Sequence, residues 1–90
     1  FVLTVDSQPD AAGKTEIRFA LPEASEVRVA IYDVAGRLVR VLADRSYVAG
    51  EHELAWDGLD SGGRGVAAGV YFYVMDAGGL RAARKMVLLR

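Results

Sequence analysis

The chain has 90 residues, of which 52% are hydrophobic, and its eleven basic and twelve acidic side chains leave a net charge of -1. This length fits one domain, and the hydrophobic content argues against a disordered linker. The balanced charge argues against an electrostatic nucleic-acid binder, which needs a basic stripe to displace counterions. The absence of cysteine excludes disulfides and thiolate metal sites.

The sequence has no membrane-spanning segment and no signal peptide, because no apolar run approaches the roughly 20 residues that cross a bilayer. The first residue is Phe1 rather than Met, and residues 1–5 already read as a strand. We therefore expect residues 1–90 to be a mature fragment or one domain cut from a longer chain. The missing signal peptide does not argue against export.

The first third of the chain predicts three strands. Residues 1–5 read as the first strand, and residues 6–13 as a polar loop that contains Pro9. Residues 15–21 alternate cleanly, with Ile17, Phe19 and Leu21 on one face, and a proline ends this strand. Residues 26–33 alternate again, with Val27, Val29 and Ile31 on one face.

A tight turn ends this third strand, because Gly36 is free to take a positive φ. Residues 37–43 fit both the helical and the strand period. The β-branched Val39 and Val41 and the short length favour a strand. A second turn is predicted at residues 48–50.

Three further strands complete the prediction. Residues 51–57 place His52, Leu54 and Trp56 on one face. A glycine-rich connection leads to residues 70–77, which are apolar on both faces and indicate a central strand. Gly78-Gly79 is a hairpin turn, after which residues 80–89 pair with the preceding strand. The fold class is therefore all-β, a seven-stranded immunoglobulin-like antiparallel β-sandwich.

The glycine-rich connection offers two candidate sites. Residues 63–68 match the G-x-G-x-x-A pattern of dinucleotide-binding loops, but that site needs a helix after the loop and here a strand follows. Asp57, Asp60 and Ser61 supply the clustered oxygens that calcium prefers. Aspartates in tight loops more often cap their own backbone, so turn capping is the favoured interpretation. We predict no metal and no cofactor.

Catalysis is not predicted. His52 is the only histidine, and no serine lies in a nucleophile-elbow pattern beside it. Trp56 is the only tryptophan, and because it shares a face with Leu54, a core position is favoured over a sugar-stacking one. Tyr71 and Tyr73 are assigned to packing for the same reason.

Basic residues gather in the last predicted strand, where Arg84, Lys85 and Arg90 lie close to the chain end. Charged side chains on an edge strand discourage edge-to-edge pairing, and this is the simpler interpretation. The alternative is that these three residues bind a partner.

The ordered motifs of the chain resemble a known family. They are Gln8-Pro9, Thr15-x-Ile17-x-Phe19-x-Leu21-Pro22, Val27-x-Val29-x-Ile31-Tyr32-Asp33-Val34-x-Gly36-Arg37-x-Val39, Gly50-x-His52-x-Leu54-x-Trp56-Asp57-Gly58, Gly69-Val70-Tyr71-Phe72-Tyr73 and Arg84-Lys85-Met86-Val87. This order closely resembles the Ig-like domain of the flagellar hook-capping protein and the related C-terminal sorting domains of secreted bacterial proteins, which are similar to type IX secretion signals.

The resemblance implies a non-catalytic C-terminal sorting or anchoring module of a secreted or surface bacterial protein, recognised by secretion or anchoring machinery. It marks six structural signature residues: Gly36, Trp56, Asp57, Gly58, Gly69 and Tyr71. Two alternatives remain open. One is a structural assembly module that packs on neighbouring domains or on copies of itself, and the other is a carbohydrate-binding accessory module.

Overall fold

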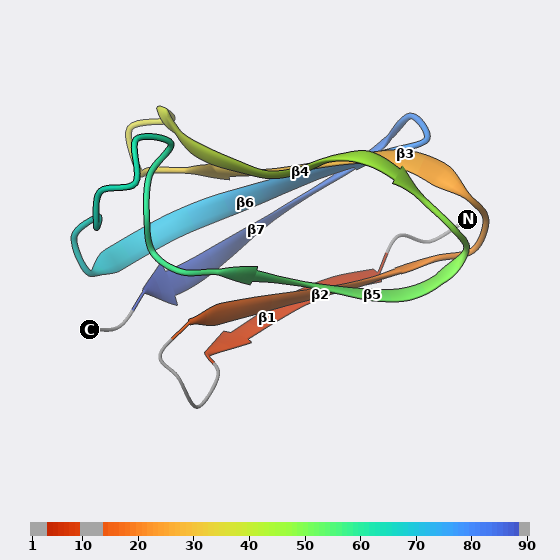
Figure 1. The fold of residues 1–90 in the computed structure, drawn as a ribbon, viewed down its shortest axis with the longest axis horizontal. Coiled ribbons are helices and arrows are strands. Elements are labelled where there is room, and N and C mark those ends of the chain that lie inside the picture. The colour runs from red at the N-terminus through yellow and green to blue at the C-terminus, as the bar shows by residue number, and fades with distance from the viewer. Residues whose placement is uncertain (1–3, 10–13, 89–90) are drawn as a thin grey trace.

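Two antiparallel sheets pack face to face in the computed structural model, which describes residues 4–9 and 14–88 (Figure 1). The three-stranded sheet has the order β1-β2-β5, and the four-stranded sheet has the order β4-β3-β6-β7. The strands are β1 (Thr4–Pro9), β2 (Thr15–Leu21), β3 (Ser25–Tyr32), β4 (Leu38–Tyr47), β5 (Gly50–Trp56), β6 (Gly69–Ala77) and β7 (Leu80–Leu88). The prediction of an all-β antiparallel sandwich is confirmed.

The core lies between the sheets and follows from the alternation of apolar residues. Ile17 of β2, Val29 and Ile31 of β3 and Met75 of β6 are fully buried, and Trp56 joins them from the end of β5. Each fully buried side chain of this size contributes roughly 1.5–3 kcal/mol relative to an exposed one. The inward faces predicted for β2, β3 and β5 are confirmed.

The first strand differs from the prediction of a strand at residues 1–5 and a loop at residues 6–13. Residues 1–3 and 10–13 lie outside the described residues, but the strand continues to Pro9, which pairs with Thr15. The position of β1 explains the error, because it is an edge strand that pairs only with β2. A proline at the end of an edge strand removes no ladder hydrogen bond, so Pro9 does not end the strand early.

The predicted strand at residues 37–43 is also corrected, because β4 continues to Tyr47. Its pairing with β3 contains two register shifts, which leave Val39 and Leu42 as extra residues in β4. Both extra side chains pack against the core, whereas Leu38 and Val41 face outward. These bulges break the alternation of inward and outward residues that a regular strand shows. This is why residues 37–43 fit both the helical and the strand period. The strand interpretation is confirmed over the helical one.

The remaining connections follow the prediction closely. β6 lies between β3 and β7 and is a central strand. Gly78 and Gly79 both have positive φ, at 56° and 85°, as a two-residue hairpin turn of this kind requires. Between Tyr47 and Gly50 the chain crosses from the four-stranded sheet to the three-stranded one, so β4 and β5 border the same side of the sandwich (Figure 1).

Candidate functional site

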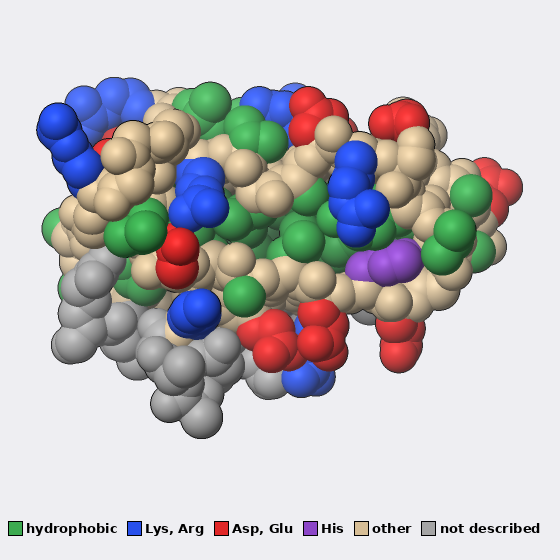
Figure 2. All heavy atoms as spheres, in the orientation of Figure 1, with side chains coloured by type: hydrophobic (Ala, Val, Ile, Leu, Met, Phe, Trp, Pro, Cys, Tyr) green, Lys and Arg blue, Asp and Glu red, His purple; other side chains and the backbone are tan. Residues whose placement is uncertain are grey.

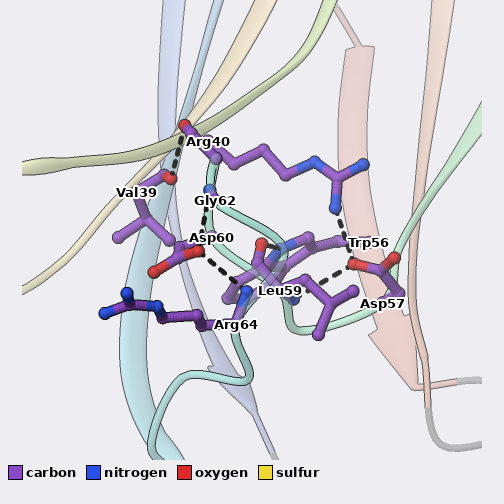
Figure 3. A network of polar contacts seen from close by, with 9 residues as sticks. Val39, Arg40, Trp56, Asp57, Leu59, Asp60, Gly62 and Arg64 are labelled. Atoms are coloured by element: carbon purple, nitrogen blue, oxygen red, sulfur yellow. Dashed lines mark hydrogen bonds and ion pairs between the residues drawn. The ribbon is translucent and has the colours of Figure 1, made fainter.

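Trp56 anchors the long loop that connects β5 to β6. Its indole is fully buried, and Nε1 donates a hydrogen bond to the carbonyl oxygen of Leu59 at 2.9 Å (Figure 3). The ring meets Tyr71 edge to face, with the centroids 5.2 Å apart. The Tyr71 hydroxyl in turn donates to the carbonyl oxygen of Ala67 at 2.7 Å. Core positions for Trp56 and Tyr71 are therefore confirmed, and Trp56 offers no exposed face to a sugar ring.

Asp57 closes the start of this loop and ties it to the other sheet. Its Oδ1 accepts a hydrogen bond from the backbone N–H of Leu59 at 3.0 Å and another from Arg40 Nη1 of β4 at 2.8 Å (Figure 3). Gly58 follows with a φ of 77°, a conformation that glycine adopts without steric cost. The carbonyl oxygen of Gly58 accepts from the N–H of Val66, which closes the loop from its far side.

Asp60 caps the tip of the same loop. Its Oδ1 accepts from the backbone N–H groups of Gly62 and Arg64, at 2.9 and 3.0 Å (Figure 3). Ser61 donates its backbone N–H and its hydroxyl to the carbonyl oxygen of Val39. Turn capping by Asp57 and Asp60, the favoured interpretation, is confirmed. Across residues 4–9 and 14–88 no three His, Cys, Asp or Glu side chains gather so as to hold a metal ion.

The glycine-rich segment of residues 63–68 leads directly into β6, which begins at Gly69 with a φ of 146°. A strand thus follows the segment, as the sequence predicted. A pyrophosphate site of the dinucleotide-binding type uses the N-terminus of a helix at this place. The segment therefore serves as a connection between sheets.

A second capped turn joins β3 to β4. Asp33 Oδ1 accepts from the backbone N–H groups of Ala35 and Arg37, and Oδ2 accepts from Arg37 Nε at 3.0 Å. These hydrogen bonds, chiefly the one from the Arg37 backbone, lower the pKa of Asp33 below its ordinary value. Gly36 completes the turn with a φ of 83°, which confirms that the residue has the positive φ predicted for it.

The lowered pKa of Asp33 predicts a pH-dependent contribution to stability. A carboxylate whose pKa is lower in the folded than in the unfolded chain stabilises the fold above its unfolded pKa of about 4. That stabilisation is lost as the pH falls through the folded value. We expect Asp33→Asn to lower Tm at pH 7 and the difference from wild type to narrow at about pH 3. Thermal unfolding followed by circular dichroism tests this, and a pH-independent difference would contradict it.

A shallow hollow of about 450 Å³ lies between the two capped loops. Its polar lining consists of Asp33, Arg37, Asp60, Ser61 and Tyr71. Each of these five side chains already makes a hydrogen bond to one of the two loops or to β4. A ligand pocket instead needs polar groups that converge on the ligand. The hollow therefore follows from loop closure.

His52 lies in an aromatic cluster at the β4–β5 side of the sandwich. Its ring lies 5.3 Å from that of Phe19 and 4.8 Å from that of Tyr47, and Nε2 donates to the carbonyl oxygen of Val48. The Arg45 guanidinium lies over the Tyr47 ring at 4.1 Å. Figure 2 shows hydrophobic side chains on this side of the sandwich, with the histidine among them. The interpretation of His52 as a packed strand residue is confirmed.

Two of the three basic residues proposed as a partner-binding cluster, Arg84 and Lys85, do not share one surface. Arg84 pairs with Tyr73 and lies on the core-facing side of β7, whereas Lys85 pairs with Phe72 and lies on the outer side. Both side chains are exposed, because β7 is an edge strand. Arg90 lies outside the described residues. A role of Arg84, Lys85 and Arg90 in binding stays a prediction.

The outer face of the four-stranded sheet carries the feature that sequence reasoning missed. Opposed residues of neighbouring strands place one apolar side chain beside another over much of this face. Leu38 and Val87 are each 50% exposed, and Val41 and Val70 are each 38% exposed. We call the following residues the apolar patch: Tyr32, Leu38, Val41, Val70, Phe72, Val74 and Val87.

Four charged residues border the apolar patch in one row across the sheet. Arg28 pairs with Asp44 on one side and with Asp76 on the other, and Asp76 pairs with Arg81. We call these four residues the charged row. Arg81 Nε lies 3.5 Å from Asp76 Oδ1. The pKa of Arg28 is raised, first by a hydrogen bond to Tyr32 and further by the charges of Asp44 and Asp76.

The outer face of the three-stranded sheet is different in character. Arg18 of β2 bonds Glu16 at 2.6 Å and lies 3.5 Å from Glu53 of β5. The outward side chains described on these two strands are Glu16, Arg18, Ala20, Glu51, Glu53 and Ala55. A charged outer face of this kind is usual where a sheet meets water. The apolar patch is therefore an excess of hydrophobic surface on one face of the sandwich.

A signal for the apolar patch is present in the sequence. Residues 70–77 are apolar on both faces, which we used only to predict a central strand. In a sandwich of two layers each strand has one face toward the core, so the second apolar set has to lie outside. Val70, Phe72 and Val74 are that second set, and their exposure depends on the layer arrangement.

Comparison with known proteins assigns the fold to a family. The sequence profile of the FlgD Ig-like domain matches residues 4–79. The chain belongs to the FlgD Ig-like domain family. The crystal structure of FlgD from P. aeruginosa matches it at 24% sequence identity with a TM-score of 0.64, covering 96% of this chain and 70% of that one. At this identity the structure supports the fold alone. A comparison with curated proteins found no match.

These findings confirm the predicted resemblance to the Ig-like domain of the flagellar hook-capping protein. The FlgD Ig-like family and the sandwich fold indicate a structural, non-catalytic module. The predicted resemblance to type IX sorting domains is not shown by any of these comparisons. The profile match ends at Gly79, immediately before β7. Within the described residues there is no helix of the length and apolarity that crossing a bilayer requires.

Proposed function

We propose that this FlgD-like Ig domain is an assembly module of a larger exported protein, and that it packs against another protein layer through the apolar patch. The observation that carries the proposal is the difference between the two outer faces of the sandwich. One face presents ionic side chains such as Arg18 and Glu53 to water. The other presents exposed valine and leucine side chains beside half-buried aromatic ones.

The unfavourable free energy of exposing apolar surface to water supports this assignment. Removing apolar surface from water is favourable by about 25 cal/mol per Å². A partner that covers the apolar patch therefore gains a favourable contribution to its free energy of binding. Isolated apolar side chains on a surface are ordinary, but contiguous patches mark interaction sites. Here the patch is contiguous, because Leu38 opposes Tyr32, Tyr32 opposes Phe72, and Val70 opposes Val87. A protein that packs on the apolar patch would add a third layer to the two-sheet sandwich.

Cysteine labelling tests the proposal, because the chain has no cysteine of its own. Single variants Val70→Cys and Val87→Cys report on the apolar patch, and Glu53→Cys reports on the charged outer face. In the dilute 90-residue chain, we expect a maleimide reagent to label all three cysteines rapidly. In the native full-length protein, we expect labelling at positions 70 and 87 to slow by at least about tenfold, as burial in an interface requires.

The variant at position 53 is the matched control. Its labelling rate is expected to remain the same in the dilute chain and in the full-length protein, because it lies on the opposite face. Equal rates at positions 70 and 87 in the two samples would overturn the proposal. Circular dichroism of each variant shows whether the substitution has left the fold intact.

A second candidate function is C-terminal sorting or anchoring, with secretion or surface machinery as the partner. The exposure of Arg84 and Lys85 on an edge strand favours it. The test is a reporter fused to residues 1–90 that carries Arg84→Glu and Lys85→Glu, compared with Glu51→Lys and Glu53→Lys, a control that reverses two charges of the opposite sign on the other sheet. Loss of export with the first pair alone would support sorting. Unchanged export would reject these two residues as the signal.

A further inference from the structure

The charged row and the apolar patch together specify a partner for this face. We infer that the protein layer on the apolar patch is a second copy of this chain, related to the first by a two-fold axis parallel to the strands. The inference rests on the proposed function, because it names the occupant of the same surface.

The register arranges the outward side chains of the four-stranded sheet in rows. In strand order β4-β3-β6-β7, one row reads Asp44, Arg28, Asp76, Arg81. The next outward row reads Val41, Ala30, Val74, Ala83, and the one after it reads Leu38, Tyr32, Phe72, Lys85. The charges in the first row therefore alternate across the sheet, from negative on β4 to positive on β7.

A two-fold axis parallel to the strands reverses this order in the second copy while it preserves the rows. β4 of one copy then lies over β7 of the other, and β3 lies over β6. Asp44 faces Arg81 of the second copy, and Arg28 faces Asp76 of the second copy. Because the row alternates over an even number of strands, all four positions meet the opposite charge. The charged row is thus complementary to its own rotated copy.

The other in-plane two-fold axis, perpendicular to the strands, gives no such match. It preserves the strand order and reverses the order of the rows. The charged row of one copy would then lie over the apolar rows of the other, where its charges would lose water without gaining partners. The charge pattern therefore selects one of the two symmetric arrangements.

The apolar rows fit the selected arrangement as well. Tyr32 lies over Phe72 of the second copy, which allows the aromatic contacts that stabilise interfaces. Leu38 lies under Lys85 of the second copy, whose aliphatic stem can cover it while the ammonium group reaches water. Sheets that pack face to face are turned by about 30° relative to each other, so each sheet turns about 15° from the axis. Contacts near the axis, on β3 and β6, are preserved best.

The size of the face predicts a weak dimer. The molecule extends 35 Å along its longest axis, which runs roughly along the strands (Figure 1), and 27 and 20 Å along the other two axes. One face of such a molecule is at most about the size of the roughly 800 Å² that each partner contributes to a standard interface, and the apolar patch covers only part of that face. We therefore expect association at micromolar to millimolar concentrations, and a neighbouring chain held nearby would strengthen it.

Charge reversal across the two-fold axis tests the inference. Asp44→Arg places a positive charge at position 44 of one copy opposite the positive charge of Arg81 in the other, and this happens twice in each dimer. Arg81→Glu places two negative charges opposite each other at the same two positions. We expect each single variant to weaken self-association at least about tenfold, measured by sedimentation velocity from about 10 µM to about 1 mM. An equimolar mixture of the two variants should form a heterodimer with nearly wild-type affinity. The double variant should recover self-association by itself.

Glu53→Arg is the matched control, because it reverses a charge on the other face, and it should dimerise like wild type. Thermal unfolding of each variant verifies that the fold is retained. A wild-type chain that is monomeric at about 1 mM, or variants that do not complement each other, would overturn the second copy as occupant. Slower maleimide labelling of the Val70→Cys and Val87→Cys variants in the full-length protein would then still support the proposed function, with another partner on the apolar patch. Absence of both results would reject both proposals.

Discussion

Replacement of Trp56 by alanine is expected to reduce the free energy of unfolding by about 3–5 kcal/mol, the range for removal of a buried aromatic side chain. The indole is fully buried, and it carries the hydrogen bond to Leu59 and the edge-to-face contact with Tyr71. Small domains have a total stability of about 5–15 kcal/mol, so this loss leaves little. Urea unfolding followed by circular dichroism measures it, because the variant has no tryptophan fluorescence.

Trp56→Phe separates packing from hydrogen bonding in the same measurement. It retains most of the buried ring but lacks the Nε1 donor to the Leu59 carbonyl oxygen. We expect a smaller loss, about 1–3 kcal/mol, because the partly buried Leu59 carbonyl oxygen loses its partner and a small cavity forms. A loss below about 1 kcal/mol for the alanine variant would contradict the role of Trp56 as the anchor of the loop.

Removal of residues 85–90 is expected to unfold the domain. The deletion takes away Met86 and Leu88, which are 5% and 3% exposed and pack in the core. Truncation of a buried side chain of this size costs about 2–5 kcal/mol once the cavity it leaves is included, so the combined loss reaches the stability of a small domain. The deletion also leaves half of β6 without its neighbour, because Gly69 to Phe72 pair with this segment. Circular dichroism and thermal unfolding of the truncated chain test this expectation.

The double substitution Arg84→Glu and Lys85→Glu is the matched control for this deletion. Both side chains are exposed, so we expect a change in the free energy of unfolding within about 1 kcal/mol. A truncated chain that still melts cooperatively near the wild-type temperature would contradict the assignment of β7 to the core. Loss of export after truncation therefore does not identify a sorting signal in β7, whereas loss after the double substitution does.

Much of the fold was predictable because local patterns were decisive. Ile17, Phe19 and Leu21 alternate with polar residues, and Gly78-Gly79 permits only a narrow choice of turns. The errors arose where position in the sheet outweighed the local pattern. Pro9 suggested a loop but lies on an edge strand that tolerates it. Val39 and Leu42 are bulge residues, and nothing in their immediate sequence marks them as such.

The features of the candidate site also fall into two groups, those that local sequence predicts and those that it does not. Capping by Asp57 and Asp60 was predictable, because the partners lie within four residues along the chain. The charged row and the full extent of the apolar patch were not, because their members come from four strands whose order the sequence does not state; only the second apolar face of residues 70–77 signals part of the patch. Arg28 meets Asp76 across 48 positions of the chain, and only the register reveals the alternation of charge. The full extent of the apolar patch and the charged row can therefore be recognised only when the order and register of the strands are known.

The placement of the outermost described residues determines how the domain responds to tension. Thr4 pairs with Ala20, whereas Leu88 pairs with Gly69 at the opposite end of the long axis (Figure 1). A pull between Thr4 and Leu88 therefore runs along the strands. It loads the ladders of β1 with β2 and of β6 with β7 in shear, so that many hydrogen bonds share the force instead of opening one after another. We expect a pull between these two residues to unfold the domain at a higher force than a pull directed across the strands.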